Sequence, residues 1–292
     1  MTHLTIFTAP KPFTHPHIAV IQRNAIQSWL RLPECEVMLI GDEPGIAEAA
    51  ADLGVRHLPH VERNAHGTPL LSSIFGLARE HSDAPLLCYV NADIILFADV
   101  VAAARAAAQQ TGRFLIVGQR WDMDITAPLD FAPGWEARLR AELAAHGKLH
   151  APMGSDYFIF PRACYTDMPA FAVGRAGWDN WMIYKARKAG WPAIDATHDV
   201  TIIHQNHDYS HLPGGQPHYK LPETDENIRL AGGRAATRFT LLDTDRRLEN
   251  GRMRPQSLDG ERLWRRIEAW PLLSLGAGNL SESLRRLRQK IR

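Results

Sequence analysis

Asn91 and Asp93 interrupt an otherwise apolar run from Leu86 to Leu96. A run without polar alternation predicts a strand that is buried on both faces of a parallel sheet. Ligands of such sheets bind beyond the carboxyl ends of the strands, so a carboxylate there is placed to contact a ligand or a metal ion. We therefore predict that Asp93 lies where the strand ends and faces a ligand. The alternative is that Asp93 caps the helix expected near Ala98, although Asp99 is better placed for that role.

Asp179 is a second carboxylate, and its surroundings in the sequence suit proton transfer. It lies in the sequence Trp178-Asp179-Asn180-Trp181, where a loop is expected to enter a helix. An aspartate beside side chains that exclude water is suited to accept a proton from a hydroxyl group. Two alternatives stay open, because aspartate also caps helices well and most tryptophans pack in a core rather than stack on a sugar.

Three histidines, His204, His207 and His211, follow the last expected strand of the sheet. Their spacing is compatible with a zinc site of a hydrolase. However, no cysteine lies nearby, and Asp208 is the only local carboxylate that could complete such a site. We interpret His207 and His211, together with His198, as ordinary loop histidines.

Short apolar runs alternate with segments of helical periodicity in the first part of the chain. Strands are predicted over residues 4–8, 36–41 and 55–58, with a helix from Pro16 and another over 47–53 between them. This alternation predicts an α/β fold, in which right-handed crossovers build a mostly parallel central sheet with helices on both faces. Further along, the patterns predict strands over 114–118 and 193–203, and helices over 99–110 and 135–146 and from Trp178.

Polar residues also follow other predicted strands. The loop from Val61 to Pro69 leads into a helix with Thr68 as its expected N-cap, and free amides at such a helix start would favour an anion. Asp122 and Asp124 follow the strand over 114–118, where they either face the site or are simply solvated.

Composition narrows the class of protein. The 292 residues are 45% hydrophobic and 22% charged, which suits a globular domain with a substantial core. A net charge of +1 gives no attraction to nucleic acid, and no apolar run is long enough to span a bilayer. The N-terminus lacks the pattern of a signal peptide, so we expect a cytoplasmic protein in which Cys35, Cys88 and Cys164 are reduced thiols.

The order of these segments resembles that of a GT-A-fold glycosyltransferase. The resemblance extends over residues 4–211 and rests on a leading nucleotide-binding half, the Asn91-Ala92-Asp93 motif, the Gly-Ser-Asp-Tyr-Phe strand at 154–158, the acidic helix start at Asp179 and a histidine after the next strand. It implies a GT-A-like, Rossmann-like domain. It also implies an inverting, hexosyltransferase-type enzyme that moves a sugar from a nucleotide-sugar donor to a carbohydrate or lipid-linked acceptor.

The resemblance further implies roles for individual residues. Asp93 and His204 would hold Mn²⁺ or Mg²⁺ on the diphosphate, where the cation neutralises the charge of the leaving group, and an imidazole ligand would favour Mn²⁺. Asp179 would be the general base. Asn91 replaces the first aspartate of the family's Asp-X-Asp motif, which lowers the negative charge of the site. The other implied contacts are to the donor, from Ala9, Asp42, Arg63, Asn91 and Asp93, and to the acceptor, from Asp156, Trp178 and Trp181.

Two other classes of protein stay open. A nucleotidyltransferase would use a similar sheet, but it should carry a glycine-rich basic loop after the first strand, and Ala9–Phe13 is not of that kind. A non-catalytic carbohydrate-binding protein would need exposed aromatic side chains and no acid, and it would bind sugar without nucleotide.

The tail differs in composition from the rest. Residues 246–292 contain twelve Lys and Arg against five Asp and Glu, so we divide the chain into a catalytic domain at 1–245 and a basic helical extension at 246–292. Leu280, Leu284, Leu287 and Ile291 share one helical face, with basic residues over much of the remainder. This pattern predicts either peripheral contact of residues 280–292 with the inner face of a membrane or packing of the helix on its own domain.

Overall fold

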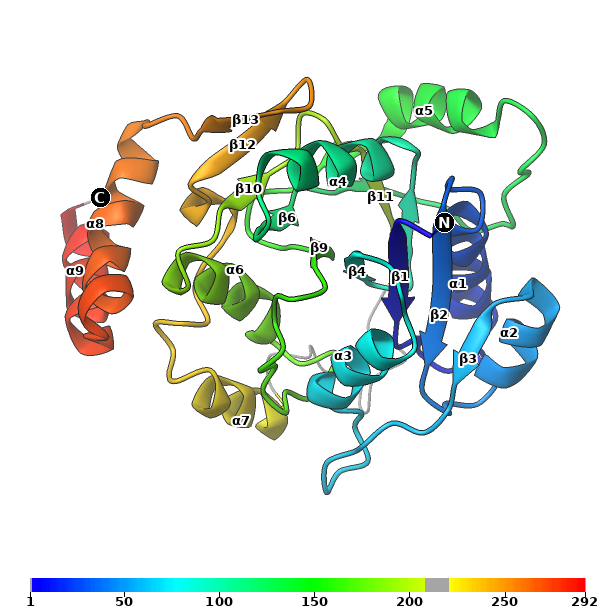
Figure 1. Ribbon diagram of the computed structural model, residues 1–292, viewed down its shortest axis with the longest axis horizontal. Coiled ribbons are helices and arrows are strands. Elements are labelled where there is room, and N and C mark those ends of the chain that lie inside the picture. Colours follow the sequence, from blue (N-terminus) through cyan, green and yellow to red (C-terminus); the bar gives the residue numbers. More distant parts are fainter. Residues whose placement is uncertain (1, 208–220, 292) are drawn as a thin grey trace.

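The computed structural model describes residues 2–207 and 221–291 and has an α/β fold with a large, mostly parallel sheet (Figure 1). Within the described residues this sheet has nine strands in the order β13-β12-β10-β6-β9-β4-β1-β2-β3. Their bounds are β1 (Leu4–Thr8), β2 (Cys35–Ile40), β3 (Arg56–Leu58), β4 (Leu86–Val90), β6 (Leu115–Val117), β9 (Tyr157–Pro161), β10 (Ala193–Asp195), β12 (Arg246–Glu249) and β13 (Arg252–Pro255).

The direction of the strands determines which loops meet. Strands β1, β2 and β4 run parallel, whereas β9 is antiparallel to both β4 and β6. The register pairs Val90 with Tyr157, so the residue before β9 lies beside the residue after β4. The polar residues that follow β1, β2 and β4 and those that precede β9 therefore share one edge of the sheet.

Helices cover both faces of the sheet, as predicted. Side chains of α1 (Pro16–Trp29), α2 (Ile46–Leu53) and α4 (Asp99–Gln110) belong to one buried core, and those of α3 (Leu71–Glu80) and α6 (Trp178–Lys188) belong to the other. Successive residues of β4 alternate between the two cores, with Cys88 in the first and Tyr89 in the second. The unbroken apolar run of this strand thus reflects burial on both faces.

A second, smaller sheet is formed by four strands among the described residues. It has the order β5-β11-β7-β8 and consists of β5 (Ile94–Leu96), β11 (Ile202–Gln205), β7 (Trp121–Met123) and β8 (Lys148–Leu149). Helix α5 (Trp135–His146) packs against it and agrees with the predicted helix over 135–146. A third, smaller core lies between α5 and the small sheet.

The run from Leu86 to Leu96 is not one strand. It divides into β4 and β5, which belong to different sheets, because β5 pairs antiparallel with β11 after a turn at residues 91–93. The backbone in this turn makes new contacts: the Asn91 amide donates to the Asp156 carbonyl at 2.9 Å. The prediction that the polar pair lies where the strand ends is confirmed, and the continuation of the strand beyond it is wrong.

The start of α3 also differs from the prediction. The helix begins at Leu71, and its N-cap is Leu70 rather than Thr68. The amides of Leu70 and Leu71 donate to the carbonyls of Glu62 and Phe171, at 2.9 and 2.8 Å. These donors are used within the protein, so they do not form the anion site that we expected.

The C-terminal extension is helical only from residue 260. Residues 246–255, which we assigned to the extension, form β12 and β13, and β12 pairs parallel with β10 of the large sheet. The chain continues through α8 (Gly260–Leu275) and α9 (Gly278–Ile291), which form a hairpin at one end of the molecule (Figure 1). Helix α7 (Pro222–Leu230) precedes these elements. No helix among the described residues is both long and apolar enough to cross a membrane.

Trp29 joins the two sheets, and its substitution tests that connection. The indole Nε1 on α1 donates to the carbonyl of Ile94 on β5 at 2.8 Å, and the side chain is fully buried. We expect Trp29→Phe to lower the free energy of unfolding by about 1–3 kcal/mol, because a buried hydrogen bond is lost. Urea unfolding measures the change. Trp264→Phe, at an exposed position of α8, is the control and should lie within about 0.5 kcal/mol of the wild type. Equal effects of the two substitutions would contradict the assignment.

Candidate functional site

Asp93 is the centre of the candidate site. Its side chain is nearly buried, and Oδ2 lies 3.0 Å from Nε2 of His207 and 3.4 Å from Nζ of Lys11. Its other oxygen, Oδ1, is buried without a hydrogen-bond partner among the described residues. A carboxylate oxygen that is removed from water and left unpaired costs free energy, so it is suited to receive a cation.

His204 completes a group of three potential metal ligands. One ligand atom from each of Asp93, His204 and His207 can be chosen so that all three lie within 4.8 Å of one another. His207 Nε2 lies 3.0 Å from Lys11 Nζ as well as from the carboxylate, yet one imidazole nitrogen cannot accept from an ammonium and donate to a carboxylate at the same time. A divalent cation between Asp93, His204 and His207 would use their lone pairs without this conflict, and the two nitrogen donors favour a transition metal such as Mn²⁺ over Mg²⁺.

The electrostatics favour the protonation states that a metal requires. Burial opposes ionisation of Asp93, but the positive charge of Lys11 and the hydrogen bond from His207 outweigh it and hold the pKa of this carboxyl well below its usual range. Burial also lowers the pKa of His204, against the attraction of Asp93. An ionised carboxylate and a neutral imidazole are the forms that bind cations.

Two buried glutamines hold the backbone around this centre. Gln205 on β11 donates from its amide and from Nε2 to the carbonyl of Asp93, at 3.2 and 3.1 Å. Gln22 on α1 accepts from the amide of Lys11 at 2.7 Å and donates to its carbonyl at 2.9 Å. Lys11 is thereby fixed beside Asp93, although 82 residues separate them in the chain.

A chain of charged groups leads away from the three ligands along the sheet edge. Arg120 donates from Nη1 to both oxygens of Asp156, at 3.0 and 2.9 Å, and from Nε to Asp122 at 2.9 Å. Asn91 donates to the same Asp156 carboxylate at 2.9 Å, and Asp122 Oδ1 lies 3.2 Å from Nδ1 of His204. The predicted acceptor residue Asp156, the predicted donor residue Asn91 and the predicted ligand His204 are therefore parts of one network.

Asp179 lies at the first turn of α6. Gly177 precedes it as the N-cap with φ of +104°, a conformation that favours glycine and lets the chain turn sharply into the helix. Burial raises the pKa of Asp179 to about 6, with a contribution from the charge of Asp156, while hydrogen bonds from backbone amides oppose the shift. Gly177 rather than Asp179 is therefore the N-cap, although backbone amides of the helix start hydrogen-bond to the Asp179 carboxylate. This carboxylate is basic enough to accept a proton near neutral pH.

Trp178 and Trp181 lie in the core rather than on a surface. Their side chains are 5% and 6% exposed. The ring of Trp178 packs at 5.1 Å against Tyr89, and that of Trp181 packs at 5.2 Å against Phe171. This geometry favours the packing alternative over the prediction that the two rings stack on the acceptor.

The predicted donor residues after β1 and β2 lie at the same edge of the sheet. Ala9 directly follows β1, and Asp42 follows β2. Arg63 forms ion pairs with Asp42 and with Glu43, the latter at 2.9 Å. The Asp42 side chain is 60% exposed, so it can contact a ligand while it holds Arg63.

Several residues of the site were not identified from the sequence. Lys11 and Arg120 belong to no motif. His207 was assigned to a loop and does lie in the loop after β11, where its contact with Asp93 also brings it into the candidate site. The signal for His207 was present in the His-x-x-His spacing. Of the other candidates, Asp124 binds the amide of Asn206, His198 is exposed, and Asp208 and His211 lie outside the described residues. All three cysteines are free thiols, as predicted.

Neither a family model nor a curated protein matches this sequence. Solved structures with a similar arrangement include the mannosyltransferase PcManGT from Pyrobaculum calidifontis in complex with GDP-Man and Mn²⁺, at 17% identity and a TM-score of 0.45. The match covers 72% of this chain and 58% of the mannosyltransferase, which is less than two thirds of its length.

A second similar structure is glucosyl-3-phosphoglycerate synthase from Mycobacterium tuberculosis in complex with Mn²⁺, UDP and glucosyl-3-phosphoglycerate. It is 14% identical over 89% of this chain and 88% of that chain, with a TM-score of 0.47. At such values the likeness concerns the course of the chain and carries no information about the substrate of this protein.

The predicted roles of His204 and His207 as metal ligands can be tested by metal binding alone. We expect His204→Ala and His207→Ala each to weaken Mn²⁺ binding at least about tenfold, because each removes one nitrogen ligand. Titration of free Mn²⁺ followed by electron paramagnetic resonance measures this affinity. His198→Ala, at an exposed histidine beyond the site, is the matched control and should bind as the wild type does. Wild-type affinity in both ligand variants would exclude the site.

Proposed function

We propose that this protein is a glycosyltransferase that moves a hexose from a nucleotide-diphosphate sugar to a hydroxyl group of an acceptor. The observation that carries the proposal is the placement of Asp93, His204, His207 and Lys11 together at the carboxyl edge of the parallel strands. This edge is where open α/β sheets bind nucleotides. The Asn91-Ala92-Asp93 motif gives the edge a carboxylate directly after a buried strand.

The charged groups of the site suit a diphosphate. When bound, a divalent cation held by Asp93, His204 and His207 would neutralise charge on the departing diphosphate. The ammonium of Lys11 lies beside the same carboxylate and adds a fixed positive charge that does not depend on metal. The nucleoside would extend toward Ala9, Asp42 and Arg63, the other polar residues at this edge.

Asp179 is proposed as the general base. In a single displacement, the acceptor oxygen forms a bond to the anomeric carbon while the bond from that carbon to the diphosphate oxygen breaks. The electron pair leaves with the diphosphate, and the hydroxyl proton passes to the Asp179 carboxylate. This reaction inverts the configuration of the anomeric carbon. Asp156 is held by Arg120 and Asn91 and is near enough for its charge to contribute to the raised pKa of Asp179, and it is proposed to orient the acceptor.

The acceptor and the place of the reaction belong to the proposal as well. We propose a carbohydrate or lipid-linked acceptor and an enzyme that acts in the cytoplasm. A lipid-linked acceptor would be met at the inner face of a membrane.

The donor can be identified by a direct binding screen. UDP-, GDP-, CMP- and ADP-linked sugars, each with and without Mn²⁺, should include one that raises the melting temperature in a metal-dependent manner. Asp93→Asn keeps the size of the side chain but removes its charge, and we expect it to abolish that metal-dependent shift. Asp83→Asn, at an exposed position, should keep the shift. A donor that binds Asp93→Asn as well as the wild type would contradict the proposal.

The base can be tested by its pH dependence. Because the carboxylate form of Asp179 must accept the proton, kcat/KM should rise with pH and level off above about 6, the pKa of this group. Asp179→Asn should keep donor affinity but lower kcat by about 10²–10⁴. The exposed Asp225→Asn is the control.

The product also distinguishes the mechanisms. Nuclear magnetic resonance of the product should show inverted anomeric configuration. A retained configuration would remove Asp179 from the role of base, and an unchanged pH profile in Asp179→Asn would do the same.

A further inference from the structure

Exposed apolar side chains are concentrated on the α8–α9 hairpin. Among the described residues eleven large hydrophobic side chains are exposed, and seven of them lie on these two helices. We call these seven the hairpin surface: Leu263, Trp264, Ile267, Trp270, Leu275, Leu280 and Leu287. The exposed fraction is 57% for Trp270 and reaches 64% for Leu275. Such a concentration of apolar side chains marks an interaction site rather than the usual scatter of single residues.

An ordinary surface helix turns its apolar stripe toward the core. Helix α8 does so through Leu272, which is buried, but it also carries a second apolar face that points away from the core. Leu263, Ile267 and Trp270 recur at spacings of four and three, so they share one face, and this face is exposed. Arg265 and Glu268 lie on the opposite, protein-facing side, where Glu268 is 4% exposed.

Ion pairs, rather than apolar contacts alone, attach the hairpin to the protein. Arg265 on α8 pairs with Asp243, whereas Arg288 on α9 pairs with Glu268 on α8 at 2.8 Å and so joins the two helices to each other. Arg238 pairs with Glu282 of α9. These pairs hold the two helices in a fixed orientation that leaves the hairpin surface in water.

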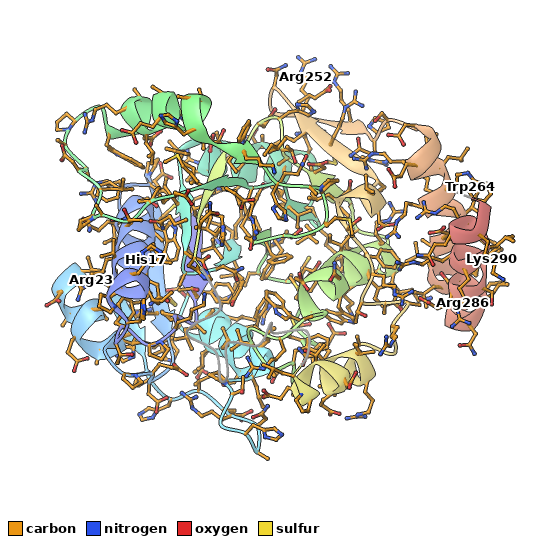
Figure 2. The ribbon with its side chains drawn as sticks, turned by 180° about the vertical axis from the view of Figure 1, so that it is seen from behind. His17, Arg23, Arg252, Trp264, Arg286 and Lys290 are labelled. Carbon is orange, nitrogen blue, oxygen red and sulfur yellow. The ribbon has the colours of Figure 1, made fainter. Side chains whose placement is uncertain are left out.

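Basic side chains border the hairpin surface. Arg286 and Lys290 are exposed on α9, four residues apart, on either side of Leu287 in the sequence. Figure 2 shows both of them with Trp264 at the end of the molecule that the hairpin forms. Tryptophan and aliphatic side chains next to lysine and arginine are the combination found where proteins enter the headgroup region of an anionic bilayer.

We propose that the hairpin surface binds an anionic lipid bilayer. Trp264, Ile267 and Trp270 enter the boundary between headgroups and acyl chains, and Arg286 and Lys290 bind the negative headgroups. The charge complementarity selects a membrane over a neutral protein partner. The proposal is independent of the sugar transfer proposed above, although together they would bring the enzyme to a lipid-linked acceptor.

Vesicle co-sedimentation of the full chain tests the proposal. The vesicles contain 30% phosphatidylglycerol in phosphatidylcholine or phosphatidylcholine alone, at low and high salt. The wild type should bind the anionic vesicles at low salt, and binding should weaken as salt screens the charges. The double variants Trp264→Ser/Trp270→Ser and Arg286→Glu/Lys290→Glu should each bind at least about tenfold more weakly.

Matched controls separate the hairpin surface from general stickiness and charge. Leu30→Ser/Leu149→Ser removes exposed apolar residues elsewhere, and Lys148→Glu/Arg252→Glu makes the same change of charge away from the hairpin (Figure 2 labels Arg252). Both should bind within about twofold of the wild type. Circular dichroism and melting temperature should be unchanged in all four variants, because every substituted side chain is exposed.

Three results would overturn the proposal. The first is an absence of wild-type binding to anionic vesicles at low salt. The second is equal loss of binding in the control and hairpin variants. The third is a wild-type dimer, seen by light scattering, that the tryptophan substitutions dissociate, because the surface would then bind a second copy. None of these results bears on donor binding in solution, so a failure here leaves the proposed sugar transfer untouched.

Discussion

The site depends on the stabilisation of one buried carboxylate. Asp93 is 7% exposed, and a charge so far removed from water needs compensation. The structure supplies it from distant segments, since Lys11 follows β1 and His207 follows β11. Neither the large sheet nor the small sheet alone could supply both. The requirement to compensate Asp93 therefore coincides with the junction between the sheets, and the glutamines that hold the backbone there, Gln22 and Gln205, are themselves buried.

This arrangement explains why the polar groups form a network rather than isolated pairs. Arg120 would be costly to bury with one carboxylate only, and it contacts both Asp156 and Asp122. Asp122 in turn contacts His150 at 2.7 Å. Each charge near Asp93 is thus offset by a neighbour, which fixes the side chains before any ligand arrives. A site fixed in this way loses less entropy on binding than one built from mobile side chains.

The sequence predicted the sheet better than the site. Periodicity and helix signals located most elements to within a residue or two, because local packing determines them; Gly54, for example, ends α2 at φ of +66°. The break between β4 and β5 was missed because it depends on pairing with β11, about 110 residues later. The strand predicted over 193–203 is likewise wrong, because it divides into β10 in the large sheet and β11 in the small sheet. Lys11 was missed for a similar reason, since Asp93 is 82 residues away. Arg120 was missed because its contact with Asp156 depends on the fold, although its other partner, Asp122, is a near neighbour in the sequence. For Trp178 and Trp181 the sequence left two alternatives open, packing in the core or stacking on the acceptor. Only the burial of the two rings in the structure distinguishes between them.

The tail shows what composition alone leaves undecided. Its basic residues and periodic leucines are equally compatible with a helix that buries its apolar face and with one that exposes it. Glu268 determines which face of α8 is exposed. It is buried, and it attracts Arg265 and Arg288 to the protein side of the hairpin. Once these cations point inward, the stripe that includes Ile267 and Trp270 must point outward. A buried acidic residue paired with cations from the chain thus orients each of two surfaces in this protein: Asp93 beside Lys11 at the edge of the sheet, and Glu268 beside Arg265 and Arg288 beneath the hairpin.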